Sequence, residues 1–155
     1  MGSIVSIWIK RSHSGAMDRV GEAQLVAGRG LVGNADQGRR RQITLIDEGA
    51  WAEALLELDG DVEPSARRAN ILLRGVDLLD SRGKILRLGA CTVQIFGETR
   101  PCHLMDEMHA GLRNALSAPW RGGAFGEILE GGAIRVGDAA EWISLNAERR
   151  MKNLE

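Results

Sequence analysis

The stretch ILRLGACTVQIFGETRPCHLMDEM (85–108) indicates the fold class and contains the first candidate functional residue. Short apolar segments that are rich in β-branched residues and punctuated by glycine are typical of strands, so 84–97 is predicted to be β-structure. Pro101 has no amide hydrogen to donate, and the chain is therefore expected to leave the sheet there. Cys102 follows in a loop, directly before a helix predicted to begin near Leu104. The sequence thus predicts a cysteine between the end of a strand and the start of a helix.

Similar apolar runs recur along the chain and alternate with glycine-containing turns. The predicted strands are 3–9, 21–33, 41–47, 69–75, 84–97, 124–132 and 133–143. Helical spacing of apolar residues predicts helices over 48–58 and 105–116. Many short strands with few helices favour a mostly β protein, a closed or nearly closed β-barrel with a few short helices, because closure removes exposed strand edges. We expect one barrel domain over residues 1–145 and a helical C-terminal tail over 146–155.

The composition narrows the class of function. The chain has 155 residues, a formal charge of -1 and a pI near 6.3, which argues against a general nucleic-acid or membrane-surface protein. The N-terminus MGSIVSIWIK is too short and too quickly polar for a signal peptide, and no apolar run reaches membrane-spanning length. Two cysteines, Cys91 and Cys102, are too few for a disulfide framework, so a reduced cytoplasmic protein is expected.

Cys102 is the foremost candidate for chemistry. The N-terminus of the following helix, Arg100 and a protonated His103 would each favour the thiolate, which is the reactive form of cysteine. The residues alone leave open whether Cys102 is a nucleophile, a metal ligand or a small buried side chain. Cys91 lies within an apolar segment and is expected to be a packing residue. The spacing of cysteines and histidines is not typical of a zinc site.

Two segments concentrate arginine, which donates hydrogen bonds in pairs to phosphates and other oxyanions. In GRGLVGNADQGRRRQ (28–42) the backbone could form an anion-binding turn with Arg39, Arg40 or Arg41, or the turn could be flexible with solvated arginines. In ARRAN (66–70), a strand that began this early would place Arg68 and Asn70 on one face and Arg67 on the other. Those side chains would then meet an anionic ligand, or simply form a solvated entrance to the strand. His13 is expected in a solvated loop.

Taken together, these segments resemble the MOSC domain, the family named after the C-terminal domain of molybdenum-cofactor sulfurases. The similar stretches, in the family's order, are 28–47, 67–78, 85–108, 111–116 and 131–138. They span nearly the whole chain, which resembles the small, stand-alone bacterial members. Family members commonly have Gly-Asp where this chain has Gly33-Asn34. The resemblance implies a barrel of the pyruvate-kinase β-barrel-like type.

The resemblance also implies roles for the candidate residues. In the family, the cysteine at the position of Cys102 supplies a thiolate to molybdenum or carries sulfur as a persulfide. Molybdenum accepts a soft thiolate, and the phosphate of the pterin favours arginine partners. The candidates for binding molybdenum cofactor (molybdopterin) are Arg67, Arg68, Asn70, Arg40, Arg41, Arg100 and His103.

Three functions follow from the resemblance. The first is sulfur transfer, in which Cys102 accepts a persulfide from a separate cysteine desulfurase; pyridoxal phosphate is then expected on that partner and not on this chain. The second is a reductase of N-hydroxylated compounds, with Cys102 as a molybdenum ligand and electrons from a donor protein. The third is a non-catalytic module that stores or delivers cofactor. A single domain with one functional thiol favours sulfur handling.

Overall fold

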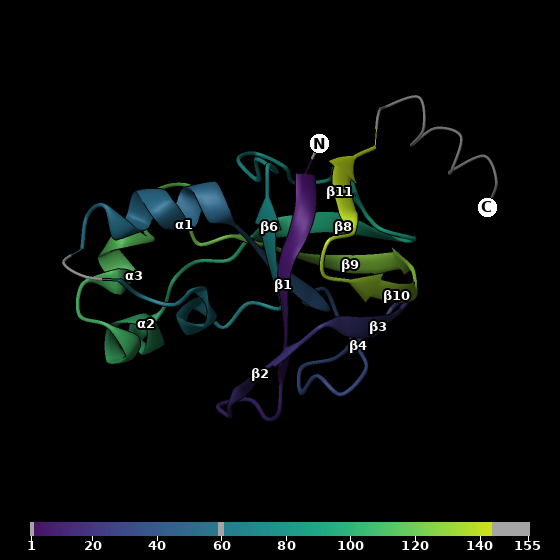
Figure 1. The fold of residues 1–155 in the computed structure, drawn as a ribbon, viewed down its shortest axis with the longest axis horizontal. Coiled ribbons are helices and arrows are strands. Elements are labelled where there is room, and N and C mark those ends of the chain that lie inside the picture. Colours follow the sequence, from purple (N-terminus) through teal and green to yellow (C-terminus); the bar gives the residue numbers. More distant parts are fainter. Residues whose placement is uncertain (1, 59–60, 144–155) are drawn as a thin grey trace.

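A closed β-barrel forms the larger part of the computed structural model, which describes residues 2–58 and 61–143 (Figure 1). The barrel strands are β1 (Gly2–Lys10), β5 (Ile43–Asp47), β6 (Ile71–Arg74), β7 (Ile85–Leu88), β8 (Cys91–Glu98), β9 (Ala124–Glu130) and β11 (Ala139–Trp142). They pair in the order β11-β7-β8-β9-β5-β6-β1, and β11 pairs with β1 to close the circle. The sheet is mixed, since β5 and β6 are parallel and the other pairs are antiparallel. The predicted closed, mostly β barrel is confirmed.

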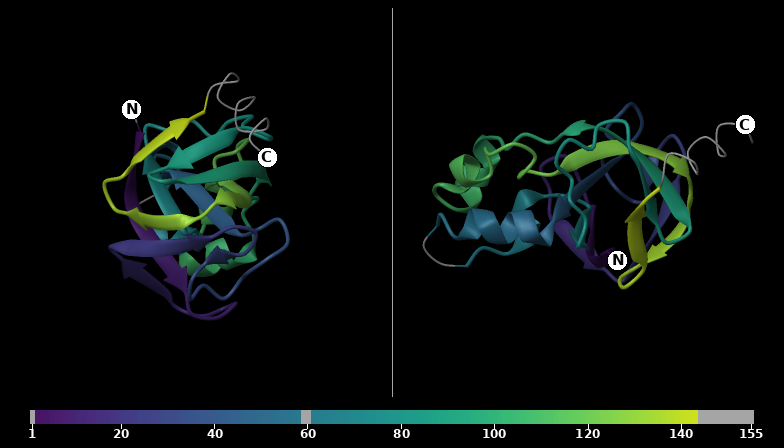
Figure 2. Two further views of the ribbon diagram at one scale, coloured as in Figure 1. Left: turned by 90° about the vertical axis from the view of Figure 1, so that its right-hand side faces the viewer. Right: turned by 90° about the horizontal axis from the view of Figure 1, so that it is seen from above.

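Shorter strands extend one side of the barrel. β2 (Met17–Val20) pairs with the last residues of β1 and was not predicted from the sequence. β3 (Glu22–Val26), β4 (Gly30–Leu31) and β10 (Gly132–Arg135) form a separate sheet in the order β10-β3-β4. β3, β4 and β10 lie on the side of the barrel away from the helices, whereas β2 reaches toward α2 (Figure 1). Seen from above, the helices stand to one side of the barrel (Figure 2).

The barrel interior is filled by aliphatic side chains from alternate strand positions, as expected for a small barrel. Ile43 and Leu45 on β5 and Ile71 and Leu73 on β6 are fully buried in this core. Burial of one such side chain contributes roughly 1.5–3 kcal/mol to stability. Because Ile43 and Leu45 point inward, Thr44 between them points out of the barrel wall. The alternation thus places a polar side chain on the outer face of β5.

Three short helices and one 3-10 turn lie together beside the barrel (Figure 1). They are α1 (Glu48–Leu55), η1 (Pro64–Arg67), α2 (His103–Met108) and α3 (Leu112–Ala115). α1 begins at Asp47, whose carboxylate accepts hydrogen bonds from the amides of Gly49 and Ala50. The helices bury a small apolar cluster of their own that includes Trp51 and Met105. In the described part of the chain, every helix falls short of the length and apolar character required to cross a membrane.

Glycine turns divide segments that were predicted as single elements. The predicted strand 84–97 is two strands, because Gly89 has a φ of 55° and turns β7 into β8. The predicted strand 133–143 is likewise split into β10 and β11 at Gly137, whose φ is 97°. Gly111, with a φ of 89°, separates α2 from α3 within the predicted helix 105–116. The predicted strand 21–33 is likewise divided into β3 and β4 by a turn that contains Gly28, whose φ is 73°. Such left-handed backbone is readily adopted by glycine, which has no Cβ.

The remaining differences concern the ends of elements. The helix predicted over 48–58 ends at Leu55. The C-terminal helix predicted over 146–155 lies outside the described residues, so the expected tail stays a prediction. Cys91 is fully buried, as predicted for a packing residue, and burial, with the nearby charges of Asp138 and Glu130, raises the pKa of its thiol.

Candidate functional site

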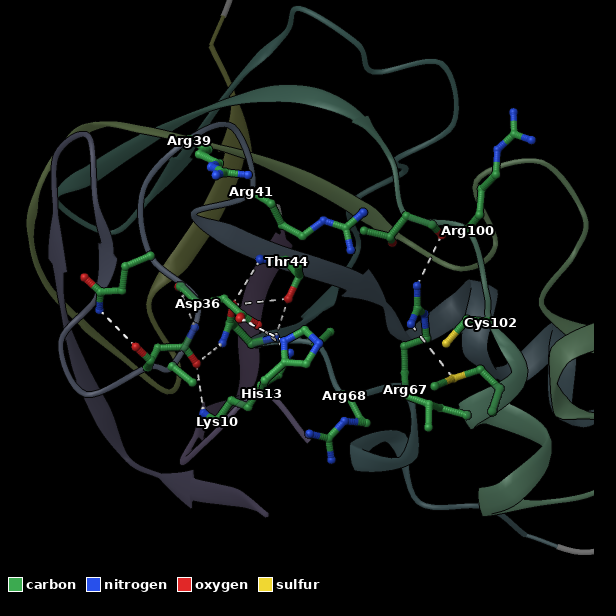
Figure 3. Close-up of a pocket in the computed structure, with 18 of the residues that line it drawn as sticks. Lys10, His13, Asp36, Arg39, Arg41, Thr44, Arg67, Arg68, Arg100 and Cys102 are labelled. Carbon is green, nitrogen blue, oxygen red and sulfur yellow. Dashed lines mark hydrogen bonds and ion pairs between the residues drawn. The ribbon is translucent and has the colours of Figure 1, made fainter. Parts of the chain in front are cut away.

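A pocket of about 600 Å³ lies against the outer face of the barrel, over Thr44 of β5 (Figure 3). Four segments far apart in the sequence form its walls: the end of β1, the glycine-rich loop before β5, the segment before β6 and the segment that follows β8. The titratable residues in its wall are Lys10, His13, Asp36, Arg39, Arg41, Arg67, Arg68, Arg100 and Cys102. A cavity of this size accommodates a small organic ligand.

The charge of this wall is strongly asymmetric. Five arginines and Lys10 face a single carboxylate, Asp36, although the whole chain has a formal charge of -1. Like charges held close together repel one another, and a bound anion relieves that repulsion. The pocket therefore has the electrostatics of an anion-binding site.

Cys102 lies at the helical end of this pocket. It is the N-cap residue of α2, its side chain makes no capping hydrogen bond, and it is half-buried. Helix α2 begins at His103, next to the predicted start near Leu104. Figure 3 shows the sulfur of Cys102 beside the guanidinium of Arg67. The predicted arrangement, a cysteine in a loop after the strand and before the helix, is confirmed.

Arg67 is held in place by main-chain oxygens. Its Nε donates to the carbonyl oxygen of Gly122 at 2.7 Å, and its Nη2 donates to that of Thr99 at 3.2 Å. Burial lowers the pKa of Arg67 to about 10, an effect that the charge of Cys102 opposes and that of Arg41 reinforces. The side chain nevertheless stays protonated at neutral pH. A fixed cation thus lies next to the Cys102 sulfur.

The two adjacent arginines reach the same pocket by a turn of the backbone. The condition for placing Arg67 and Arg68 on alternate faces of a strand is not met, because β6 begins only at Ile71. Arg67 ends the 3-10 turn η1, and Arg68 has left-handed backbone with a φ of 64°. The Nη2 atom of Arg68 is buried and has no hydrogen-bond partner in the described structure.

Asn70 ties three strands together beneath the pocket. Its Oδ1 accepts from the amide of Thr44 at 3.1 Å, and its Nδ2 donates to the carbonyl oxygen of Trp8 at 3.2 Å and to Oδ1 of Asn34 at 3.1 Å. Asn34 in turn accepts from the amide of Lys10 at 2.8 Å. These buried amides hold the glycine-rich loop against β1, β5 and β6.

The side-chain amide of Asn34 also donates a hydrogen bond within the glycine-rich loop. Its Nδ2 donates to the carbonyl oxygen of Asp36 at 3.1 Å, a bond that a carboxylate could not make. The amide therefore closes the turn that brings Asp36 to the pocket.

A family assignment agrees with this geometry: residues 32–141 match the MOSC domain family. The chain belongs to the MOSC domain family. No curated protein matches the chain. Among solved structures, YuaD from Bacillus subtilis is similar with a TM-score of 0.76 and 19% identity, over 89% of this chain and 93% of that one. YiiM from Geobacillus stearothermophilus gives 0.72 and 18%, over 93% and 76% of the chains. YiiM from Escherichia coli gives 0.68 and 16%, over 92% and 70%. At these identities the similarity concerns the fold.

The MOSC chain brings together most of the residues singled out from its sequence. The predicted residues that line the pocket are Cys102, Arg67, Arg68, Asn70, Arg41 and Arg100. Arg40 and His103 do not line it: Arg40 stacks 4.5 Å from the centre of the Phe96 ring, and His103 is exposed on α2. His13 is in an exposed turn, as predicted, and that turn also borders the pocket.

Other residues of the pocket were not identified from the sequence. Lys10, Thr44 and Thr99 belong to strands or strand ends that looked purely structural, and their sequence context contains no motif. Only the fold brings these three positions to one wall. Gly122, outside the pocket lining, was also missed: a Cβ there would come within 2.5 Å of the Thr99 carbonyl oxygen that accepts from Arg67.

Lys10, His13 and Asp36 form a charged cluster at the other end of the pocket. Lys10 Nζ lies 2.9 Å from one carboxylate oxygen of Asp36, and His13 Nδ1 lies 3.3 Å from the other. Partial burial raises the pKa of Asp36, but the hydrogen bonds and charges of Lys10 and His13 outweigh that effect, so its pKa is below the ordinary value.

Asp36→Asn is expected to destabilise the MOSC chain at neutral pH and to have less effect in acid. A lowered carboxylate pKa contributes stability above the ordinary value of 3.8, and this contribution is lost as the pH falls through the lower pKa of the folded state. Thermal melting of both proteins between neutral pH and about pH 3 measures this. A difference in melting temperature that stays constant over this range would contradict the assignment.

Proposed function

We propose that this MOSC chain binds molybdenum cofactor in the pocket and handles sulfur there, with Cys102 as the residue that carries a persulfide. The observation that supports the proposal is the combination of a half-buried cysteine without a capping bond and a cationic pocket beside it. A thiol that only filled space would not need five arginines around the neighbouring cavity.

The residues of the pocket fit an anionic pterin cofactor. The buried Nη2 of Arg68 has no partner, and a buried polar donor is costly unless it is hydrogen-bonded. A phosphate oxygen would supply the missing acceptor. Arg68 and Arg41 would hold the anionic part, whereas the amide of Asn70 is already occupied by the protein. When bound, the cofactor would supply a metal that accepts a soft sulfur ligand.

The chemistry of Cys102 begins with transfer of a sulfur atom from a donor persulfide. The thiolate of Cys102 attacks the outer sulfur of the donor, the donor S–S bond breaks, and the donor leaves as a thiolate. A new S–S bond forms on Cys102 and no electrons are gained or lost overall. The protonated guanidinium of Arg67, fixed by Gly122 and Thr99, stabilises the negative charge of the attacking sulfur and of the resulting persulfide.

A partner must supply the persulfide. We propose a cysteine desulfurase, which would carry the pyridoxal phosphate, in the cytoplasm. The partner would then release sulfane sulfur from cysteine, and the barrel protein would receive that sulfur on Cys102.

A second function is favoured by the position of Cys102 in the wall of the pocket. Because the sulfur faces the same cavity as the arginines, the thiolate could itself bind the metal of the cofactor, and the chain would then reduce N-hydroxylated compounds with electrons from a donor protein. The two functions differ in what is attached to the sulfur. Native mass spectrometry of protein purified from a molybdenum-replete host distinguishes them.

Sulfur transfer predicts an added mass of one sulfur atom that reducing agents remove. The ligand role predicts the mass of a pterin cofactor together with molybdenum in elemental analysis. Protein without any added mass, even after incubation with sodium polysulfide and with cofactor released from another molybdoenzyme, would contradict both functions.

Arg68→Gly is expected to separate ligand binding from stability. Glycine adopts the left-handed backbone of this position without strain, so the free energy of unfolding should stay within about 1 kcal/mol of the parent. Binding of an anionic ligand should weaken by about tenfold or more, since a buried charge-assisted hydrogen bond is lost. Urea denaturation and the pterin content of purified protein measure the two effects. Unchanged pterin content would contradict the assignment of Arg68.

A further inference from the structure

Two stacked arginines flank the pocket on its strand side. Arg40 lies 4.5 Å from the centre of the Phe96 ring, and Arg41 lies 4.9 Å from that of Phe125. The two rings are stacked with their centres 6.3 Å apart. Arg82 completes the group by donating from Nη1 to the carbonyl oxygen of Phe96 at 3.0 Å. We call these five residues the arginine–phenylalanine patch.

The patch is solvent-accessible and its charge is not neutralised. Arg40, Arg41 and Arg82 are exposed, and the two phenylalanines are partly exposed. None of these arginines forms an ion pair with a carboxylate in residues 2–58 and 61–143. A guanidinium that lies flat on an aromatic ring keeps its N–H groups at its edge, where they can donate to a carboxylate.

Strand geometry connects the patch to the pocket. Thr44, in the pocket wall, is directly paired with Phe125 of the patch, and Arg41 belongs to both. From Phe96 the chain runs through the exposed Arg100 to Cys102, and six residues of chain span at most about 22 Å. A protein bound on the patch would therefore be within reach of the Cys102 sulfur.

A β-bulge in β8 shapes the backbone under the patch. The register of β8 against β9 shifts between Ile95 and Gly97, which leaves Phe96 as the extra residue of a bulge. A Cβ at Gly97 would lie 3.2 Å from both Arg82 Nη1 and a Phe125 ring carbon, so these two side chains pack over the glycine. These contacts restrict the side chains of the patch, and each side chain already held in place lowers the entropic cost of binding.

We propose that the arginine–phenylalanine patch is the docking surface for an acidic protein, the cysteine desulfurase that delivers sulfur to Cys102. This inference rests on the proposed function. Arginine and aromatic side chains are the residue types most enriched in the centres of protein interfaces, and the unpaired positive charge requires a partner surface rich in aspartate and glutamate. The acidic pI of about 6.3 for the whole chain favours this partner over a nucleic acid.

The test measures binding between the full chain and a cysteine desulfurase purified from the same organism. The variant is Arg40→Glu combined with Arg82→Glu, two exposed positions outside the pocket. The matched control is Arg87→Glu, an exposed arginine of β7 near the hairpin turn of β7 and β8. The double variant should bind about tenfold more weakly, mainly through slower association, while the control stays within about twofold of wild type. Added salt should weaken the wild-type complex more than that of the variant.

Equal affinities for the wild type and the double variant, or no complex with the wild type, would overturn the docking proposal. A fluorescent poly-dT oligonucleotide that bound through Arg40 and Arg82 more tightly than the desulfurase would also overturn it, by assigning the patch to nucleic acid. Loading of Cys102 by sodium polysulfide is measured in parallel, because this donor needs no docking surface. If polysulfide loads Cys102 equally in the wild type and the double variant, the proposed function is supported whatever the binding result. If polysulfide loads Cys102 in neither protein, the result counts against the proposed function and not against the docking proposal.

Discussion

Cys102→Ser is expected to abolish the persulfide on the MOSC chain and to leave its fold intact. A serine hydroxyl stays protonated at neutral pH and does not form the S–S bond that the transfer requires. The Cys102 side chain is half-buried and makes no capping hydrogen bond, so little packing is lost. Serine is moreover a preferred N-cap residue, which should keep α2 at least as stable as in the wild type.

The matched control for this variant is Cys91→Ala. Cys91 is fully buried in the barrel, and burial is the main reason that the pKa of its thiol is raised, so it should take no part in the transfer. Mass spectrometry after incubation with sodium polysulfide should therefore show an added sulfur on the Cys91→Ala protein and none on the Cys102→Ser protein. The reverse result would place the chemistry on Cys91 and contradict the assignment of the site.

Asn70→Ala is expected to cause the largest loss of stability among the pocket residues. Asn70 is 4% exposed, and its side chain bonds to Thr44, Trp8 and Asn34. Removing it leaves buried donors and acceptors on three segments unpaired, at about 1–3 kcal/mol each when water cannot reach them. We expect a decrease of about 3–5 kcal/mol in the free energy of unfolding, measured by urea denaturation.

Asn114→Ala serves as the control for the loss of an amide side chain. Asn114 is exposed on α3, and alanine has the higher helix propensity, so its replacement should change stability by less than about 0.5 kcal/mol. Asn70→Asp provides a second comparison, because it keeps the acceptor for Thr44 but loses the donor to Trp8 and Asn34. Its second carboxylate oxygen would face the carbonyl oxygen of Trp8 and Oδ1 of Asn34 with no proton between them, so this variant should be at least as destabilised as Asn70→Ala. A loss of stability as small as that of Asn114→Ala would show that the buried amide network contributes little.

Local chemistry explains which parts of the fold were predicted correctly. The periodicity of apolar residues identified β1, β5 and α1, because side chains that face one core repeat at the period of the element. Single-residue backbone turns were the main source of error. At Gly89, Gly111 and Gly137 the apolar pattern continues on both sides of the turn, and periodicity alone could not show that the chain reverses there.

The candidate site was predictable to the extent that it depends on residue type. The position of Cys102 between Pro101 and a helix, and the clustering of arginines, are properties of neighbours in the sequence. The direction in which those arginines point is not. Arg67 and Arg68 both reach the pocket because the backbone of Arg68 is in the left-handed region. Arg41 lines the pocket wall, whereas the neighbouring side chain of Arg40 lies over the Phe96 ring.

The sequence by itself determined that the chain is a closed, mostly β barrel of the MOSC family and that Cys102 follows a strand and precedes a helix. The mostly β barrel and the position of Cys102 follow from local patterning and turn chemistry, which act over a few residues, whereas the family follows from the resemblance of whole segments. Only the tertiary structure decided that Lys10, Asp36, Arg67 and Cys102 share one pocket and that Arg40 stacks on an aromatic ring beside it. The physical reason is that barrel closure, strand register and burial bring together segments that are far apart in the sequence. Their separation along the chain does not predict their distance in space.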